Sequence, residues 1–572
     1  MEPVSNHQIA DIITETARLM EVHGVNEFKI KSMQNAAFNI SRMESPLCKY
    51  SKQELEQIKG IGKSISEKII EIVNTGTLPE LKSLLNDTPS GVVEIMLIKG
   101  IGPKKAATVW KDLGVESPGE LLYACNENRL TELKGFGSKT QEQIKKAIEF
   151  ALGTKGFFHY AALEASASAM IDLLSETGWF PEVSLTGAIR RKCEILQDIS
   201  ILAATNDPEQ TLEKIKTSSL FTNLKIEVID RTLMMSNPEG IVFKLQLTSP
   251  SNFALQLFLS TASISHLEKL KEIKAFEQLR DATVSSETEL YKLLGLPFIE
   301  PELREGTIEI EFASGNHIPT LIEFHDLKGS LHNHSTYSDG IHSLREMAQA
   351  CRDAGYEYLG ICDHSKSAFY ANGLNEDRIA LQHAEIDALN IEMAPFRIFK
   401  GIESDILHDG SLDYPTPVLQ KFDFIVASVH SGLKMTKEKA TERLLKAISD
   451  PHTTILGHPT GRLLLAREGY PIDHKSVIDA CAQHGVVIEL NAHPYRLDLD
   501  WRWIQYALSQ NVMISINPDA HHISGFHDMY FGVCVARKGM LTKSMTFNTL
   551  SVSEIEQWFL KRKKLQTTET LG

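Results

Sequence analysis

The sequence lacks several features that mark common classes of protein. Its seven cysteines include no Cys-x-x-Cys pair, which predicts a reduced, cytoplasmic environment rather than a disulfide framework. No apolar run approaches ~18 residues, and the N-terminus lacks the basic-then-apolar pattern of a signal peptide, so no contact with a membrane is expected. The net charge of −15 argues against a basic surface that covers the protein for duplex DNA, although local contacts through backbone amides remain open.

The remaining composition is that of a globular protein of several domains. The chain has 572 residues, 42% of them hydrophobic and 23% charged. A single core does not grow to this size, so about three to four domains are expected. We expect a monomer, and the sequence predicts no particular protein partner.

Three segments of the first 150 residues repeat one pattern, in which two glycines flank an apolar residue between helical stretches. The glycines permit a tight turn, and the N-terminus of the helix that follows leaves backbone N–H groups available for a phosphate. The repeat therefore predicts contacts to the DNA backbone that do not read sequence. The alternative, that these turns only pack the domain, stays open. The candidate contacts are Gly60, Gly62 and Lys63; Gly100, Gly102 and Lys104; and Gly135, Gly137 and Lys139.

A stretch in the middle of the chain, Asp198-Ile199-Ser200, has half the pattern of a metal-binding strand. Two carboxylates at positions i and i+2 of a strand point to the same face and can share a divalent cation. Here the second position is a serine. The apolar runs 241–247 and 253–259 further along are both predicted to be strands.

The three glycine turns, the Gly-x-x-Arg-Arg segment from Gly187 and the segment LGLPFIEPELREG at 294–306 resemble the PolX proteins, the family X DNA polymerases of bacteria and archaea. The resemblance covers nearly the whole chain. It implies a multidomain α+β and α/β fold with four parts. These are a helical lyase-like domain with a helix-hairpin-helix (1–88), a tandem helix-hairpin-helix (89–152), a nucleotidyltransferase palm and thumb (153–318) and a C-terminal domain (325–572).

The same resemblance implies a polymerase site that this chain does not retain. The family's first aspartate matches Asp198, but the second falls on Ser200 and the third on Lys244. Serine supplies no negative charge for magnesium, and an ammonium group repels it. We therefore expect polymerase activity to be lost. The Arg190–Arg191 pair is interpreted as a phosphate contact or a solvated face, and Lys68 matches the lysine that forms a Schiff base in some family members.

The last 240 residues carry a set of candidate metal ligands, each at the end of a short apolar run. The runs alternate with helical stretches, which predicts a barrel of parallel strands, and functional groups gather at the C-terminal ends of such strands. Histidine and carboxylate side chains suit Zn²⁺ and Mn²⁺. The predicted ligands are His332, His334, Asp339, His364, Glu403, His430, His458, Asp519 and His521.

These motifs resemble the PHP domain, a metal-dependent phosphoesterase module with a distorted barrel of seven β/α units. The resemblance implies three divalent ions (Zn²⁺, Mn²⁺ or Fe), with Glu403 bridging two of them. His332, His334 and Asp519 would complete the first site and His430 and His458 the second, whereas Asp339, His364 and His521 would hold the third. Glu403, Asp519 and Arg462 are the expected catalytic residues, and Arg462 would steady a phosphate.

Taken together, the motifs predict a 3′→5′ exonuclease that acts in DNA repair on gapped, nicked or single-stranded 3′ ends. Three alternatives stay open: an active gap-filling polymerase, a small-molecule phosphatase of the histidinol-phosphatase type, and a DNA-binding scaffold without enzymatic activity.

Overall fold

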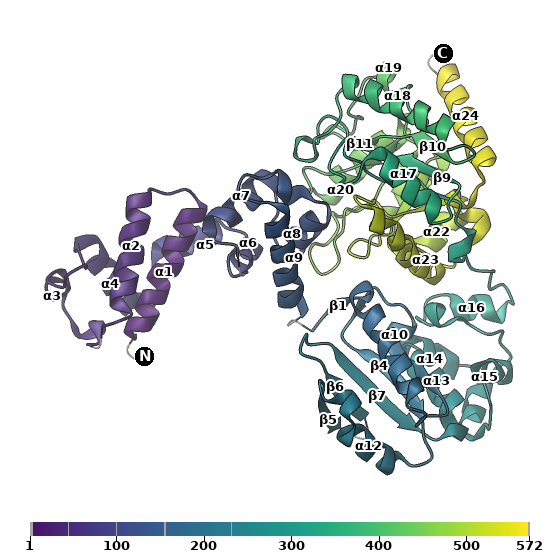
Figure 1. The fold of residues 1–572 in the computed structure, drawn as a ribbon, viewed down its shortest axis with the longest axis horizontal. Helices are drawn as coiled ribbons and strands as arrows, with labels where there is room; N and C mark the ends of the chain where they lie inside the picture. Colours follow the sequence, from purple (N-terminus) through teal and green to yellow (C-terminus); the bar gives the residue numbers. More distant parts are fainter. Residues whose placement is uncertain (1–3, 44, 99, 154–155, 230–231, 570–572) are drawn as a thin grey trace. The chain divides into compact units, whose positions relative to one another are not determined.

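The computed structural model describes residues 4–43, 45–98, 100–153, 156–229 and 232–569 (Figure 1). The chain divides into two compact units, Met1–Glu149 and Phe150–Gly572. Within the described residues, no helix is long and apolar enough to cross a membrane. The division into four domains stays a prediction.

The first unit is helical. Helix α1 opens with a capping box between Ser5 and Gln8, and it buries Ile9 and Ile13 against α2. Lys99, in the second glycine turn, lies outside the described residues. The helices are α1 (Asn6–Val22), α2 (Glu27–Ile40), α3 (Lys52–Glu56), α4 (Lys63–Thr75), α5 (Pro79–Asn86), α6 (Ser90–Ile95), α7 (Pro103–Leu113), α8 (Pro118–Asn126) and α9 (Ser138–Gly153), with short 3₁₀ helices η1 (Leu47–Lys49) and η2 (Arg129–Glu132).

The second unit begins with a mixed five-stranded sheet of order β2-β4-β7-β6-β5. Its strands are β2 (Val183–Leu185), β4 (Ile199–Ala204), β5 (Lys225–Ile229), β6 (Thr232–Ser236) and β7 (Val242–Thr248). β4 and β7 are parallel neighbours, which places Ser200 directly opposite Lys244. Helices of this part are α10 (Tyr160–Glu176), α11 (Gly187–Arg190), α12 (Pro208–Thr217), α13 (Phe253–Thr261), α14 (Ile264–Lys271), α15 (Glu287–Leu293) and α16 (Glu309–Ser314). A two-stranded sheet, β1 (Phe158–His159) with β3 (Ile195–Leu196), lies before β4 in the chain.

The run 253–259, predicted as a strand, is helical instead. It forms the start of α13, whose buried residues are Phe253, Ala254, Leu257, Phe258 and Thr261. This spacing of three and four residues is the period of a helix with one buried face, whereas the prediction interpreted the run as the alternating pattern of a strand.

The C-terminal part of the second unit is the predicted barrel of parallel strands. The strands are β8 (Gly329–Ser330), β9 (Tyr358–Ile361), β10 (Arg397–Lys400), β11 (Glu403–Asp405), β12 (Val426–Ser428), β13 (Ile455–Leu456), β14 (Val487–Asn491) and β15 (Ile514–Asn517). They form two arcs of order β10-β9-β8 and β11-β12-β13-β14-β15. Single bridges join the arcs, Asn333 with Ala520 at one side and His364 with Glu403 at the other. β10 and β11 are halves of one bent strand, so the barrel has seven strand positions.

Helices surround these strands (Figure 1). They are α17 (Leu344–Asp353), α18 (Glu376–Glu392), α19 (Thr416–Leu419), α20 (Lys437–Ser449), α21 (His474–His484), α22 (Ile504–Ser509), α23 (Met529–Lys538) and α24 (Val552–Glu569). Strand residues such as Tyr358, Ile398, Val426 and Leu490 are fully buried, as expected for parallel strands covered on both faces.

A buried ion-pair cluster joins the barrel to the sheet of β2–β7 and its helices. Lys538 of α23 is 1% exposed, and its Nζ lies 2.6 Å from Oε1 of Glu305. The same oxygen accepts a hydrogen bond of 3.1 Å from Arg191 Nε. Burial opposes ionisation of Glu305, but Lys538 and Arg191 outweigh it and lower its pKa to about 2. The two parts of this unit are therefore held together by charge as well as by apolar packing.

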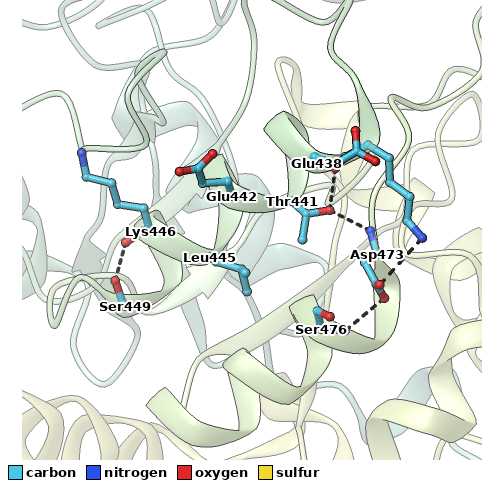
Figure 2. A pocket seen from close by; sticks show the side chains of 9 residues that line it. Glu438, Thr441, Glu442, Leu445, Lys446, Ser449, Asp473 and Ser476 are labelled. Atoms are coloured by element: carbon cyan, nitrogen blue, oxygen red, sulfur yellow. Dashed lines mark hydrogen bonds and ion pairs between the residues drawn. The ribbon is translucent and has the colours of Figure 1, made fainter.

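A surface hollow of about 670 Å³ lies between α20 and α21 (Figure 2). Lys437 and Asp473 lie 3.7 Å apart across it, and the backbone N–H of Asp473 donates to Thr441 Oγ1 at 2.9 Å. Its lining includes none of the predicted metal ligands. The candidate site lies at the strand ends instead.

Candidate active site

The predicted ligands follow the C-terminal ends of different barrel strands. His332 and His334 come directly after β8, and Glu403 is the residue where β11 begins. The remaining ligands follow β9, β12, β13 and β15, or lie in the loop after β8: His364, His430, His458, Asp519, His521 and Asp339. Because parallel strands end at one edge of the barrel, side chains up to about 190 positions apart in the chain meet there.

Glu403 lies at the centre of one group of ligands. Its Oε1 is 3.3 Å from His332 Nε2, 3.1 Å from His430 Nε2 and 3.0 Å from His458 Nε2. Its Oε2 is 2.9 Å from His364 Nδ1. One carboxylate thus contacts four histidines from four strand ends, as a bridging ligand would.

A second group surrounds Asp339. Its Oδ2 lies 3.5 Å from His364 Nε2, and its Oδ1 lies 3.4 Å from His521 Nε2 and 3.8 Å from His334 Nδ1. The rings of His334 and His521 are stacked with their centroids 4.2 Å apart.

The ligand atoms fall into three sets in which all atoms lie within 4.8 Å of one another. The sets are His334, Asp339, His364 and His521; His332, His334 and Asp519; and His364, Glu403 and His430. This grouping differs from the one implied by the PHP resemblance, because His334 and His364 each belong to two sets and His458 to none. His364 in particular has its two ring nitrogens directed at Glu403 and Asp339.

The donor set fits divalent metal ions. The nine side chains are buried or nearly so, and several of their atoms make ion-pair contacts at most, with no partner in hydrogen-bonding geometry among the described residues: His332 Nε2, His334 Nδ1, Asp339 Oδ2, Glu403 Oε2 and both ring nitrogens of His364. A buried polar atom without a partner is costly, and coordination to a cation would satisfy it. His458 and Asp519 also hold unusual positive φ angles of 21° and 54°, local strain of the kind found at functional sites.

The charges around the site favour cations. Burial disfavours the charged form of His332, but Glu489, Asp519 and Glu403 outweigh it and raise the pKa of His332 well above its ordinary value. Burial, with His521 and His364 nearby, lowers the pKa of His334 to about 3, so that ring is neutral and able to act as a ligand. The pocket therefore combines an excess of negative charge with a neutral imidazole.

Two carboxylates that support the ligands were not predicted. Glu489, fully buried on β14, accepts a hydrogen bond of 2.7 Å from His332 Nδ1, and Asp405 lies 2.6 Å from His430 Nδ1. Because each carboxylate contacts Nδ1 of its histidine, Nε2 of that histidine is directed at Glu403. The sequence signal was a lone carboxylate inside the apolar run VVIEL for Glu489, and the i+2 position after Glu403 for Asp405.

The three glycine turns adopt one conformation. The first glycines, Gly60, Gly100 and Gly135, have φ values of 93°, 96° and 92°. The apolar residue between the glycines is buried in each turn, and its N–H donates to the carbonyl three residues earlier at 3.0, 3.0 and 3.1 Å. Gly62 and Gly102 cap α4 and α7 without a side-chain hydrogen bond, which leaves the N–H groups of the first helical turn available to a ligand, except at Pro103 of α7, which has none.

Comparison with known proteins finds family matches for both the segment with the glycine turns and the barrel. Residues 4–78 match the model of a helix-hairpin-helix domain, residues 93–149 a SAM-like helix-hairpin-helix tandem, and residues 330–493 the PHP domain. A Bacillus subtilis (strain 168) protein named "DNA polymerase/3'-5' exonuclease PolX" is 36% identical over 573 residues, covering 97% of this chain and 99% of the relative.

The chain belongs to the PolX family. Further proteins match only part of the chain. A "Probable phosphatase" of Acetivibrio thermocellus is 29% identical over 171 residues, covering 29% of this chain and 65% of that protein. One from Caldicellulosiruptor saccharolyticus with the same name is 28% identical over 153 residues, covering 26% of this chain and 59% of its own length.

In this PolX chain, two of the three residues predicted to mark a degenerate polymerase site form an ion pair. Lys244 Nζ lies 2.7 Å from Asp198 Oδ2, and Ser200 Oγ donates to Asp198 Oδ1 at 2.7 Å. Both oxygens of the Asp198 carboxylate therefore have protein partners, one of them an ammonium group.

The Arg190–Arg191 pair of this PolX chain is neither a solvated face nor aimed at a free phosphate position. Arg190 forms a bidentate ion pair with Glu287, with contacts of 3.0 and 2.5 Å, and Arg191 contacts Glu305. The two arginines are 19% and 13% exposed. They join the C-terminal end of α11 to α15 and to the segment that carries Glu305.

Arg462, predicted as a catalytic phosphate contact, is directed elsewhere. Its NH1 lies 2.5 Å from Asp500 Oδ2, its Nε donates to the carbonyl of Arg496 at 2.9 Å, and NH2 donates to the carbonyl of Leu497. These contacts hold the 460s loop against the segment after β14. The neighbouring Arg496, 3.9 Å from Asp519 Oδ2, is the arginine that approaches the ligands.

Lys68, the predicted lyase residue of this PolX chain, pairs with Glu80 and is 16% exposed. Glu80 also accepts from Lys29 at 2.6 Å. A Schiff base requires a free amine. The ion pair occupies the amino group, so lyase activity stays a prediction that this arrangement does not favour.

Proposed function

We propose that this PolX protein is a metal-dependent phosphodiesterase that degrades DNA from the 3′ end, with its active site in the PHP barrel and its polymerase activity lost. The buried cluster around Glu403, whose ligand atoms lie close together without being satisfied by hydrogen bonds, carries the proposal. The helix-hairpin-helix turns would hold the DNA backbone through the N-terminal N–H groups of their helices. Gapped, nicked and single-stranded 3′ ends are the substrates this architecture suits.

The nine predicted ligands would hold divalent ions, with Glu403 shared between neighbouring ions. Such ions, when bound, activate water as a nucleophile and stabilise the charge that builds on phosphate oxygens. The chain's own contribution is orientation: Glu489 and Asp405 hold the Nδ1 atoms of His332 and His430, so that each Nε2 faces the centre. Arg496, 4% exposed beside Asp519, is placed to offset negative charge near the substrate phosphate.

The loss of polymerase activity is supported by the Asp198–Lys244 ion pair. Two-metal nucleotidyl transfer needs several carboxylates to hold both cations, whereas this position has one carboxylate and one ammonium group. Gapped primer–template with Mg²⁺ and deoxynucleotides should give no extension. This part of the proposal would be contradicted if the wild type extended the primer and a Lys244→Ala variant extended it as well.

The exonuclease activity is tested with a 5′-labelled single-stranded oligonucleotide and Mn²⁺. Wild type should produce a ladder of products shortened from the 3′ end, and chelation should stop it. His332→Ala and Glu403→Ala should each lower the rate at least about a hundredfold, because each removes a ligand of the cluster.

The matched control is His317→Ala, which changes a histidine outside the barrel and should retain the wild-type rate. No degradation with Mn²⁺, Zn²⁺ or Fe²⁺ would refute the proposal. If both ligand variants degraded DNA at the wild-type rate, the active site would have to lie outside the barrel.

A phosphatase acting on small molecules is the second candidate, since part of the chain also matches proteins named "Probable phosphatase". The two functions can be distinguished by comparing the rates of hydrolysis of a phosphodiester and a phosphomonoester. A phosphodiesterase hydrolyses thymidine 5′-monophosphate p-nitrophenyl ester faster than p-nitrophenyl phosphate, and a phosphatase shows the reverse preference.

A further inference from the structure

Phe369 is the most exposed large apolar side chain that the structure describes, with 88% of its surface accessible. It lies in the loop 365–374 that follows β9. Burial of a phenylalanine stabilises a fold, so an almost fully exposed ring contributes little to this one. The exposed ring is therefore available to bind a ligand.

The loop that presents Phe369 is held in one conformation. Ser367 donates from its backbone N–H to Asp413 Oδ2 at 2.7 Å and from its hydroxyl to Asp405 Oδ2 at 2.9 Å. At the far end of the loop, Arg378 NH1 donates to the carbonyl of Asn372 at 2.7 Å. The exposed ring is thus mounted on a fixed support, which lowers the entropy lost when a partner stacks on it.

Both ends of the same loop lie beside a predicted metal ligand, His364. It begins directly after His364, and the backbone N–H of Leu374 donates to the carbonyl of His364 at 2.8 Å. The ring of Tyr370, next to Phe369, meets the His364 imidazole edge to face with the centroids 6.2 Å apart. The loop that carries Phe369 therefore borders the cluster of predicted metal ligands.

Two other exposed apolar side chains lie in loops that carry ligands. Ile341 is 49% exposed and comes two residues after Asp339, and Ile523 is 42% exposed and comes two residues after His521. The backbone N–H of Ile341 donates to the carbonyl of His521 at 2.9 Å, which ties these two loops together. An apolar rim around a charged centre suits a substrate that joins a flat apolar group to a phosphate.

We infer that Phe369 is a stacking platform for the nucleobase at the 3′ terminus of a DNA strand whose terminal phosphodiester lies at the metal cluster. This inference rests on the proposed exonuclease function and adds to it the group that recognises the terminal nucleoside. Every base has a flat π face, so such a platform accepts all four bases. A small phosphorylated metabolite without an aromatic ring would gain nothing from it.

The test compares two 5′-labelled oligonucleotides that differ only in the 3′-terminal residue, thymidine or an abasic tetrahydrofuran. Wild type should remove the thymidine with a kcat/KM roughly 5- to 150-fold higher, equivalent to ~1–3 kcal/mol of base–aromatic stacking at 1.36 kcal/mol per tenfold. Phe369→Ala should lose most of this preference, with kcat/KM on the abasic substrate unchanged within about twofold.

Two further variants separate stacking from an effect on the fold. Phe369→Trp keeps a flat ring and should keep the preference for thymidine. Ile391→Ala removes a side chain that is 83% exposed on α18, and both rates should stay at the wild-type value. The inference is overturned if Phe369→Ala slows both substrates equally or slows neither.

A binding measurement distinguishes this inference from the exonuclease proposal. If wild type cleaves neither oligonucleotide, the exonuclease proposal fails, and a 3′-terminal 2-aminopurine still reports on the platform. Its fluorescence should change on binding to wild type and not on binding to Phe369→Ala. Equal fluorescence changes with both proteins would reject Phe369 as the platform.

Discussion

At the scale of single residues, Glu489 is the side chain that organises the metal centre without being among its predicted ligands. Its Oε2 accepts from His332 Nδ1 at 2.7 Å and from Asn517 Nδ2 at 3.1 Å. Its Oε1 accepts from the backbone N–H of His458 at 3.1 Å and from Asn491 Nδ2 at 3.2 Å. All four partners are donors, so only a carboxylate satisfies the position.

We expect Glu489→Gln to weaken metal binding about 10- to 100-fold, the usual effect of losing a partner that orients a ligand. The glutamine amide would direct its N–H₂ group at two donors and release the His332 ring. Mn²⁺ titration of the chelated protein by calorimetry measures the change. Glu442→Gln, on the exposed surface of α20, is the matched control, and equal affinities in both variants would contradict the role given to Glu489.

The sequence predicted that the ligand side chains would lie at one edge of the barrel, but it did not predict which of them contact one another. The predicted ligands follow apolar runs within a few residues, as expected where a strand ends at a functional edge. The sharing of His364 between Glu403 and Asp339 depends on how the barrel closes, and no local pattern encodes this. The same holds for Arg462, whose place near His458 in the sequence suggested a phosphate contact although Asp500 holds its guanidinium group.

At the scale of elements, the repeated glycine turns show how much a short motif determines. Three segments of different sequence reach the same φ of 92–96° at the first glycine. A glycine is required there because side chains strain a backbone at this angle. The run 253–259 is the opposite case, since seven mostly apolar residues suit a short strand and a buried helix equally well.

Substitution of one turn glycine should destabilise its hairpin through backbone strain alone. At Gly100, with φ of 96°, an added Cβ would meet no atom within 4 Å. Gly100→Ala should lower the free energy of unfolding of the helical unit by about 1–2 kcal/mol. Gly102→Ala is the paired control, because Gly102 has φ of −94° and open space around it. Urea denaturation followed by circular dichroism measures both, and equal losses would contradict this explanation.

At the scale of the whole molecule, the contact between the barrel and the preceding sheet was the least predictable feature. It joins Glu305 to Lys538, residues 233 positions apart, and Arg537 to Glu302, 235 positions apart. The barrel could be predicted because each β/α unit is local in sequence. A contact between two such parts depends on surfaces that form only after each has folded.

This contact makes stability depend on pH in the acid range. The pKa of Glu305 is about 2 in the fold against 4.5 as its ordinary value, so its ionised form adds about 3 kcal/mol of stability. That contribution is complete above about pH 5 and is lost as the pH falls toward 2. Glu305→Gln should therefore be less stable than wild type by about this amount at pH 7, and the difference should shrink at pH 4 and pH 3.

Urea denaturation at the three pH values measures the difference. Glu164→Gln, in which a different carboxylate of the same unit is neutralised, serves as the control. A gap between wild type and Glu305→Gln that does not change with pH would contradict the assignment of this acid sensitivity to Glu305.

The Asp198–Lys244 ion pair has a consequence for how the protein draws on the cell's supply of divalent ions. In the sheet of β2–β7, the positive charge beside Asp198 is the side chain of Lys244. The predicted ligands of the barrel would instead bind cations from solution. Under the proposed function, a fall in free metal would leave that sheet's structure untouched and stop hydrolysis alone, so the protein would hold DNA without degrading it until metal returned.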